Sequence, residues 1–259
     1  MKSELSITLI QTNIFWKDVS RNINQISKRL EGINSNVDII LLPEMFSTGF
    51  TMSPEHVYEK MDGKTISWMK EIAIKYNSAI GGSIVIKEKG KFYNRFLFVT
   101  PLGKVSFYDK RHTFTYAGED KKYFSGKNNG IIKYNGWKIC LRVCYDLRFP
   151  VWSRNKENYD LLIYVANWPS LRINAWDRLL CARAIENCCY SVGVNCVGED
   201  PNNNKYPGHS SAYDYYGNLI SDKLSNNSEN INISIDLQSL LKYRKKFGFL
   251  KDQDSFELC

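Results

Sequence analysis

The stretch Asp38-Ile39-Ile40-Leu41-Leu42-Pro43-Glu44 decides the fold. Its aliphatic run leaves no polar face, and such a run predicts a short strand that is covered on both sides. A second run of this kind occurs at Leu161-Leu162-Ile163-Tyr164-Val165. Sheets covered on both faces need helices or another sheet as neighbours, so the sequence predicts a layered α/β fold.

Strands and helices are expected to alternate along the chain. Apolar patterns predict strands at residues 5–11, 38–42, 79–86, 95–100, 105–109, 137–143, 161–166, 191–197 and 231–235. Helical spacing predicts helices at residues 19–30, 65–76, 176–190 and 237–246, and Asp236 is a suitable N-cap for the last one. No polar segment is long enough for an interdomain linker, so we expect a single domain over residues 1–259.

The composition limits the classes of function. The formal charge is +8, but basic and acidic residues alternate rather than form a basic stripe, which speaks against nucleic-acid binding. No apolar run approaches the roughly 18 residues that span a bilayer, and no export signal is expected, so the membrane is not an expected partner. The 7 cysteines, an odd number, lie mostly in apolar segments, which is typical of reduced thiols in the cytoplasm.

Three reactive side chains each follow a predicted strand. They are Glu44, Lys110 and Cys144, and sites of α/β proteins assemble in the loops at the carboxyl ends of strands. A thiol is a weak nucleophile until it ionises; a nearby ammonium favours its ionised form and a carboxylate can accept its proton. We therefore expect the three side chains to meet at one site.

Other interpretations of these residues remain open from the pattern alone. A cysteine at a strand end is more often a small buried hydrophobe, and a lone Glu or Lys after a strand is usually solvated. A Cys–His pair would need His112 or His209 beside Cys144.

Metal binding is not expected. Cys140 precedes Cys144 by four residues, and the pair Cys188-Cys189 with His209 lacks the Cys-x2-Cys spacing of usual structural zinc sites. Cys140 is better interpreted as a packed core thiol.

The residues around these side chains resemble a known family. The segments Leu42-Pro43-Glu44-Met45-Phe46, Asp109-Lys110-Arg111-His112 and Val143-Cys144-Tyr145-Asp146-Leu147-Arg148-Phe149-Pro150 are similar to the catalytic motifs of the nitrilase, or carbon–nitrogen hydrolase, superfamily, in the family's order. Residues 164–169 and 182–187 resemble its omega-amidase branch, in particular the bacterial members.

The resemblance implies a four-layer α-β-β-α sandwich without metal or organic cofactor. It implies a thiol amidase in which Cys144 is the nucleophile, Glu44 the proton shuttle and Lys110 the electrostatic partner. Glu119 is similar to a further glutamate that many members place near the triad to position Lys110 or a water, and this role is favoured over the alternative, a solvated loop acid in a charged run. The family implies a homodimer, with a tail over about residues 237–259 at the interface.

The omega-amidase branch implies small 2-oxo dicarboxylate monoamides, 2-oxoglutaramate or 2-oxosuccinamate, as substrates. Such an anion needs a cationic clamp, for which Arg172 and Arg111 are candidates. Phe46, Tyr145 and Trp168 are candidates for the pocket wall.

Arg148 is expected instead to fix the loop around Cys144 through an ion pair. One position departs from the branch pattern, because His209 stands where the pattern has aspartate. An N-carbamoyl amino acid hydrolase, a nitrilase and a catalytically silent scaffold remain alternatives.

Overall fold

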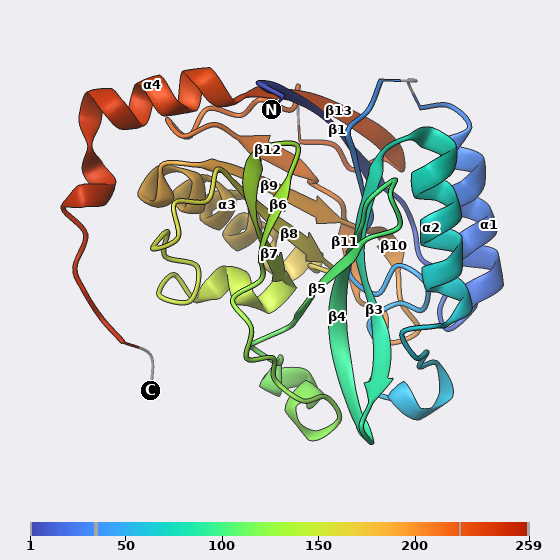
Figure 1. The fold of residues 1–259 in the computed structure, drawn as a ribbon. Coiled ribbons are helices and arrows are strands. Elements are labelled where there is room, and N and C mark those ends of the chain that lie inside the picture. The colour runs from blue at the N-terminus through green and yellow to red at the C-terminus, as the bar shows by residue number, and fades with distance from the viewer. Residues whose placement is uncertain (1, 34–35, 223, 258–259) are drawn as a thin grey trace.

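Two β-sheets packed face to face form the centre of the molecule (Figure 1). The computed structural model describes residues 2–33, 36–222 and 224–257. One sheet has the strand order β13-β1-β2-β3-β4-β5, and the other has the order β12-β9-β8-β7-β6. A short hairpin, β10-β11, lies apart from both.

The strands are β1 (Glu4–Gln11), β2 (Ile39–Leu41), β3 (Ala79–Glu88), β4 (Lys91–Val99), β5 (Val105–Asp109), β6 (Ile131–Tyr134), β7 (Trp137–Val143), β8 (Leu161–Ala166), β9 (Tyr190–Asn195), β10 (Val197–Glu199), β11 (Lys205–Pro207), β12 (Ser211–Tyr213) and β13 (Glu229–Asp236). The α-helices are α1 (Val19–Leu30), α2 (Lys64–Tyr76), α3 (Ile173–Asn187) and α4 (Leu237–Phe247).

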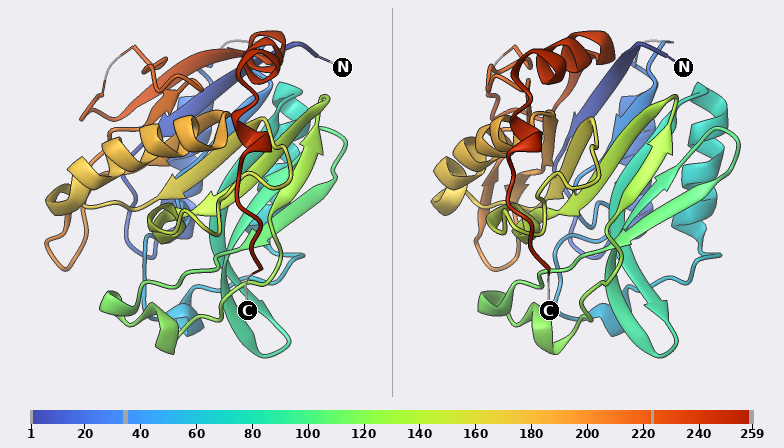
Figure 2. Two further views of the ribbon diagram at one scale, coloured as in Figure 1. Left: turned by 90° about the vertical axis from the view of Figure 1, so that its left-hand side faces the viewer. Right: turned by 60° about the vertical axis from the view of Figure 1, so that its left-hand side comes forward.

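Three apolar layers hold the sheets and helices together. Side chains of both sheets fill the central layer, where Leu9, Ile139 and Val192 are fully buried. Helices α1 and α2 cover the outer face of the larger sheet, and α3 covers the outer face of the smaller one (Figure 2). The predicted four-layer α-β-β-α sandwich is therefore confirmed.

The strand directions bring several strand ends to one edge of the sandwich. Strands β1, β2 and β3 are parallel, and β5 runs in the same direction because two antiparallel pairings separate it from β3. In the second sheet, β7, β8 and β9 are parallel. The segments that follow β2, β5, β7 and β8 carry the residues that form the site described below.

The structure differs from the sequence-based expectation in several places. The strand expected at residues 191–197 is divided, because Cys196 separates β9 from β10. The helix expected at residues 176–190 begins earlier and ends at Asn187, where Cys188 takes a left-handed conformation with φ of 45°. Strands β6, β11 and β12 were not expected, because they are too short to show a clear apolar pattern.

Helix α4 packs one face on the central layer. Asp236 caps it by accepting a hydrogen bond from the Ser239 N–H, as expected, and Leu240 and Tyr243 join the central layer. Residues 258–259 of the expected tail lie outside the described residues. No helix in the described ranges is long and apolar enough to cross a membrane.

Candidate active site

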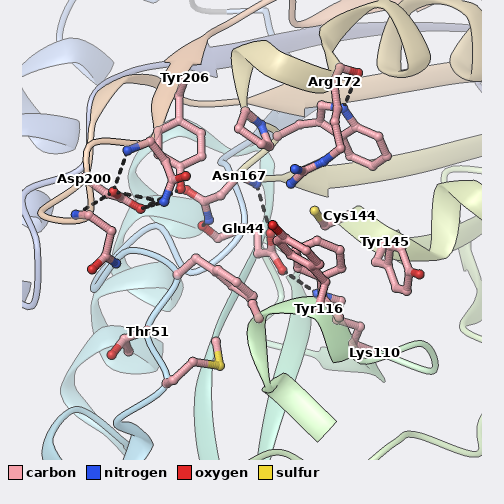
Figure 3. A pocket seen from close by; sticks show the side chains of 18 of the residues that line it. Glu44, Thr51, Lys110, Tyr116, Cys144, Tyr145, Asn167, Arg172, Asp200 and Tyr206 are labelled. Atoms are coloured by element: carbon pink, nitrogen blue, oxygen red, sulfur yellow. Dashed lines mark hydrogen bonds and ion pairs between the residues drawn. The ribbon is translucent and has the colours of Figure 1, made fainter.

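A cavity of about 500 Å³ opens at the edge where the strand ends meet. Its floor holds Glu44, Lys110 and Cys144, as the close view in Figure 3 shows. The remaining wall is formed by Trp16, Phe50, Thr51, Met52, Ser53, Phe114, Tyr116, Ala117, Tyr145, Arg148, Asn167, Trp168, Pro169, Arg172, Asp200, Asn202, Asn204 and Tyr206. The structure thus brings together the three reactive side chains that the sequence singled out.

Glu44 is fully buried and both of its carboxylate oxygens are fixed. Oε1 accepts hydrogen bonds from Lys110 Nζ at 2.9 Å and from Asn94 Nδ2 at 2.7 Å. Oε2 accepts one from the backbone N–H of Asn167 at 2.9 Å. The turn after Pro43 is sharp, because Met45 has a φ of 44° and its N–H donates to Ser83 Oγ. These contacts hold the carboxylate in one orientation.

Lys110 lies between two buried carboxylates. Its Nζ donates to Glu44 and also to Glu119 Oε2 at 2.8 Å. Burial alone would lower the pKa of Lys110, but the charges of Glu119 and Glu44 outweigh burial and raise that pKa above its ordinary value. The lysine is therefore an ammonium at neutral pH.

Glu119 is fully buried rather than a solvated loop acid. Besides Lys110, it accepts hydrogen bonds from the Phe114 N–H at 2.5 Å and from Asn94 at 3.3 Å. Burial and the charge of Glu44 raise the pKa of Glu119, while the Lys110 ammonium opposes this shift. Glu119 does not line the cavity, so its contacts position Lys110 rather than reach a ligand.

Cys144 stands at the first turn after β7. It begins a short 3-10 helix, Cys144–Arg148, with a φ of 45°. Asp146 fixes this turn, because it accepts hydrogen bonds from the Val143 N–H at 3.0 Å and from Tyr108 Oη at 2.8 Å. The fixed turn presents the thiol to the cavity.

The surroundings of Cys144 favour the protonated thiol. Burial, followed by the negative charge of Glu44, raises the pKa of Cys144 well above its ordinary value. The Lys110 ammonium lowers this pKa but does not overcome the other effects. The sequence-based expectation that the lysine would favour the thiolate is therefore outweighed, and the thiol needs a base at the moment of attack.

Asn167 and Cys196 form a short chain of hydrogen bonds that ends at the backbone of Glu44. Asn167 Nδ2 donates to the backbone oxygen of Glu44 at 2.6 Å. Asn167 Oδ1 accepts a hydrogen bond from the Cys196 thiol at 3.0 Å. Cys196 is buried, and burial raises its pKa well above the ordinary value, so the thiol is a donor. Its single proton fixes which way the Asn167 amide faces.

Two arginines reach the cavity, and they are Arg172 and Arg148. The guanidinium of Arg148 lies 5.1 Å from the Trp168 ring centre, and that of Arg172 lies 5.2 Å from the ring centre of Phe114. The ion pair expected for Arg148 is absent within the part of the chain that the structure describes. Both arginines therefore offer positive charge to a cavity ligand.

The structure places two other expected pocket residues elsewhere. Phe46 is fully buried under α2, where the centre of its ring lies 5.9 Å from that of Trp68. The ring also packs on Gly82, where the Cβ atom of any other residue would lie only 2.9 Å from a ring carbon. Arg111 points away from the cavity, toward the Trp152 ring at 5.1 Å. Tyr145 and Trp168 line the cavity as expected.

The histidines are not at the site. His112 Nδ1 lies 2.7 Å from Asp146 Oδ1 and its ring stacks on Phe149. His209 Nδ1 lies 3.0 Å from Asp177, and its backbone oxygen accepts a hydrogen bond from Trp176. Neither lines the cavity, so the Cys–His alternative finds no support. Cys140 is fully buried beneath α3, as a core thiol should be.

Sequence reasoning missed the roles of Asn94, Asn167 and Cys196, and it expected Arg148 in an ion pair rather than at the cavity. Asn94 lies within β4, opposite Val85 in the β3-β4 pairing, where a buried polar side chain is unusual. The strand predicted at residues 95–100 begins one residue after Asn94, so the sequence pattern did not single it out. For Cys196, no sequence signal separates it from the other buried cysteines.

A buried carboxylate, an ammonium and a thiol at the floor of a cavity, in an α-β-β-α sandwich, define a thiol-dependent hydrolase. The comparisons agree. The family model described as carbon–nitrogen hydrolase matches residues 6–245. Omega-amidase YafV of Escherichia coli (strain K12) is 42% identical over 254 residues, which cover 98% of each chain. The 2-oxoglutaramate amidase of Bacillus subtilis (strain 168) is 30% identical over 253 residues, covering 95% of this chain and 96% of the relative.

Among solved structures, the CN-hydrolase superfamily protein XC1258 from Xanthomonas campestris is 36% identical, with a TM-score of 0.96 over 100% of both chains. That crystal structure is described as having an arsenic adduct in its active site. The chain belongs to the carbon–nitrogen hydrolase family and is an enzyme that acts on amides. The family resemblance predicted from the three motifs is confirmed, and so is the resemblance of residues 164–169 and 182–187 to the omega-amidase branch.

Proposed function

We propose that the protein is an omega-amidase that hydrolyses 2-oxo dicarboxylate monoamides, with 2-oxoglutaramate and 2-oxosuccinamate as substrates. The observation that carries the proposal is the cavity itself, which places Cys144 beside Glu44 and Lys110 on its floor and two arginines on its wall. The names of the relatives from Escherichia coli and Bacillus subtilis support the same substrate class.

In the first half of the reaction, Glu44 accepts the thiol proton while the Cys144 sulfur attacks the amide carbon. The carbonyl oxygen becomes an oxyanion, held by the Lys110 ammonium and the backbone N–H of Tyr145. Preorganised donors of this kind contribute about 3 kcal/mol each to the transition state. The carbon–nitrogen bond then breaks, Glu44 returns the proton to the nitrogen, and ammonia leaves.

In the second half, water attacks the thioester. Glu44 accepts a proton from the water, the carbon–sulfur bond breaks, and the proton returns to the sulfur as the carboxylic acid departs. Glu119 keeps Lys110 in place through both steps, and Asn167 keeps Glu44 in place. One buried carboxylate thus serves both halves, which suits its fixed orientation.

The 2-oxo acid end of the substrate is bound by the arginines. Arg172 was the expected clamp, and Arg148 joins it on the same wall. A guanidinium binds a carboxylate with two parallel hydrogen bonds, and the aromatic rings beside both arginines hold the guanidinium planes. A carbamoyl amino acid or a nitrile with a carboxylate would use the same clamp, so the acyl product must be identified directly.

The proposal is tested by measuring ammonia and 2-oxo acid release from 2-oxoglutaramate and 2-oxosuccinamate, with Cys144→Ala as the matched control. Equal amounts of ammonia and 2-oxo acid, abolished by Cys144→Ala, are expected. Turnover of an N-carbamoyl amino acid or a nitrile, with neither monoamide cleaved, would move the assignment to those alternatives. A folded protein without turnover on any of them would support a silent scaffold.

We also propose that the chain acts as a single-domain homodimer in the cytoplasm. Exposed apolar side chains support the dimer, namely Ile185 on α3 and a group around Tyr243 that consists of Tyr216, Phe247 at the end of α4 and Phe249 just after it. The cysteines among the described residues are free, which supports a reducing compartment. Sedimentation equilibrium would test the dimer, and a monomer at micromolar concentration would exclude it.

A further inference from the structure

The cavity extends well beyond the reacting groups. In Figure 3, Asp200 and Tyr206 lie on the far side of Glu44 and Asn167 from Cys144 and Tyr145. This outer lobe is lined by Thr51, Asp200, Asn202, Asn204 and Tyr206, from the β10-β11 hairpin and the loop after Phe50. The whole cavity, at about 500 Å³, is of the size that holds drug-sized ligands, larger than a five-carbon monoamide requires.

The charges of the cavity wall are separated. The cations Lys110 and Arg172 lie near Cys144, whereas Asp200 is the carboxylate of the outer lobe (Figure 3). Asp200 is held in place, because it accepts hydrogen bonds from the N–H groups of Asn202 and Asn204 at 2.9 and 3.0 Å and from Tyr206 Oη at 2.9 Å. A ligand with an anionic end at the arginines and a cationic end in the outer lobe matches this separation.

The chemistry of the floor determines which part of an amide would reach the outer lobe. The leaving nitrogen must lie within hydrogen-bond reach of Glu44, which returns the proton to it. In the view of Figure 3, Glu44 is seen between Cys144 and Asp200, and all three side chains line the same cavity. A substituent on that nitrogen therefore points toward Asp200, while the acyl chain extends toward the arginines.

We propose that the outer lobe is a subsite for the amine portion of the substrate, so that the enzyme also cleaves secondary amides whose nitrogen carries a short, positively charged alkyl chain. The inference rests on the proposed function, since it uses the same nucleophile and the same acyl side. In the reaction the carbon–nitrogen bond breaks, Glu44 protonates the nitrogen, and a diamine leaves in place of ammonia. Water then releases the same 2-oxo acid from the thioester.

The chain offers a matched control for Asp200. Asp214 organises a second loop of the same kind, since it accepts hydrogen bonds from the N–H groups of Tyr216 and Asn218 at 2.9 Å and from Asn218 Nδ2 at 3.0 Å, as Asp200 does from Asn202, Asn204 and Asn204 Nδ2; only Asp200 also accepts one from Tyr206. Asp214 does not line the cavity. Asp200→Asn and Asp214→Asn therefore make the same change to two similar loops, apart from the Tyr206 hydrogen bond, and only the first changes the charge of the outer lobe.

The experiment compares three amides of the same acid: 2-oxoglutaramate, its N-(2-aminoethyl) amide and its N-propyl amide. Release of 2-oxoglutarate is measured for each. We expect the wild type to cleave both secondary amides and to favour the aminoethyl amide over the propyl amide in kcat/KM. Asp200→Asn should lower this ratio about fivefold, the upper range for an exposed ion pair, whereas Asp214→Asn should leave the ratio and the activity unchanged.

A second variant keeps the test valid if Asp200→Asn fails to fold, because it adds negative charge to the outer lobe instead of removing it. Asn202→Asp adds a carboxylate to the outer lobe and should raise the ratio by a similar factor. Cleavage of 2-oxoglutaramate without cleavage of either secondary amide, or a ratio that neither variant moves, would overturn the subsite and leave the proposed function standing. Failure to cleave 2-oxoglutaramate itself would overturn both.

Discussion

The hydrogen bond from Cys196 to Asn167 predicts that a cysteine outside the cavity wall controls the rate of the chemical step. Replacement of Cys196 by valine keeps the size of the side chain and removes the proton that Asn167 Oδ1 accepts at 3.0 Å. The Asn167 amide is then free to turn over, which would also break its 2.6 Å hydrogen bond to the backbone oxygen of Glu44. Glu44 would lose part of the support that fixes its orientation.

The expected size of the effect follows from these two bonds. A net hydrogen bond contributes about 1 kcal/mol, so the loss of one or both costs about 1 to 2 kcal/mol. If this cost appears in the transition state, kcat falls about fivefold to thirtyfold. KM should change by less than about twofold, because neither residue touches the substrate carboxylate in the proposed mechanism.

Two further variants separate positioning from a general loss of stability. Cys196→Ser restores a donor and should return kcat to within about threefold of the wild type. Cys189→Val changes another fully buried cysteine, whose sulfur makes only a 4.0 Å contact with the Arg183 oxygen, and should leave kcat unchanged. Steady-state kinetics and thermal unfolding of all variants test this. Equal losses of kcat in the Val and Ser variants, or in Cys189→Val, would refute the reasoning.

Three other predictions follow from the site. In the wild type the rate of alkylation of Cys144 should keep rising as the pH increases past 9, because its pKa is raised, and a plateau near neutral pH would contradict this. Glu44→Gln should abolish turnover yet speed alkylation of Cys144 by iodoacetamide at pH 7.5, because the Glu44 charge raises the thiol pKa; slower alkylation would show that this charge does not control the thiol. Arg172→Met should raise KM for 2-oxoglutaramate about tenfold, from loss of a charge-assisted hydrogen bond of about 1.5 kcal/mol, whereas Arg111→Met should leave KM unchanged, and equal effects would exclude Arg172 as the clamp.

Much of the fold was predictable because a strand that is apolar on both faces must be buried on both faces. The runs at residues 39–42 and 161–165 are buried on both sides, as their composition required. Short strands such as β12, with three residues, carry too little pattern to be recognised. The position of Cys196 between two strands depends on hairpin geometry, which hydrophobic spacing does not encode.

The candidate site was predictable to the level of strand ends but not to the direction of individual side chains. Lys110 faces the cavity, and its neighbour Arg111 faces away, as alternation along an extended segment requires. The same alternation would place Phe46 beside Glu44. The left-handed conformation of Met45 breaks it and sends the Phe46 ring into the core. Backbone conformations of this kind are not visible in a single sequence.

Hydrogen-bond partners of Glu44 that are distant in the chain could not be predicted from the sequence either. Asn94 and Asn167 both bind Glu44, although 50 and 123 residues separate them from it. The side-chain amide of Asn94 and the backbone N–H of Asn167 both donate to the carboxylate, and neutral donors of this kind fix it without neutralising its charge. The three-dimensional arrangement was needed to show that they do so.

The most direct test of the account is to detect the acyl group on Cys144 during turnover. The enzyme is mixed with 2-oxoglutaramate, quenched in acid within one turnover, digested and analysed by mass spectrometry. The account predicts that the peptide containing Cys144 gains the mass of the 2-oxoglutaryl group and that this adduct is absent from Cys144→Ala, which should also release no ammonia. Ammonia release by Cys144→Ala at the wild-type rate, or turnover with the acyl group never found on Cys144, would contradict the account.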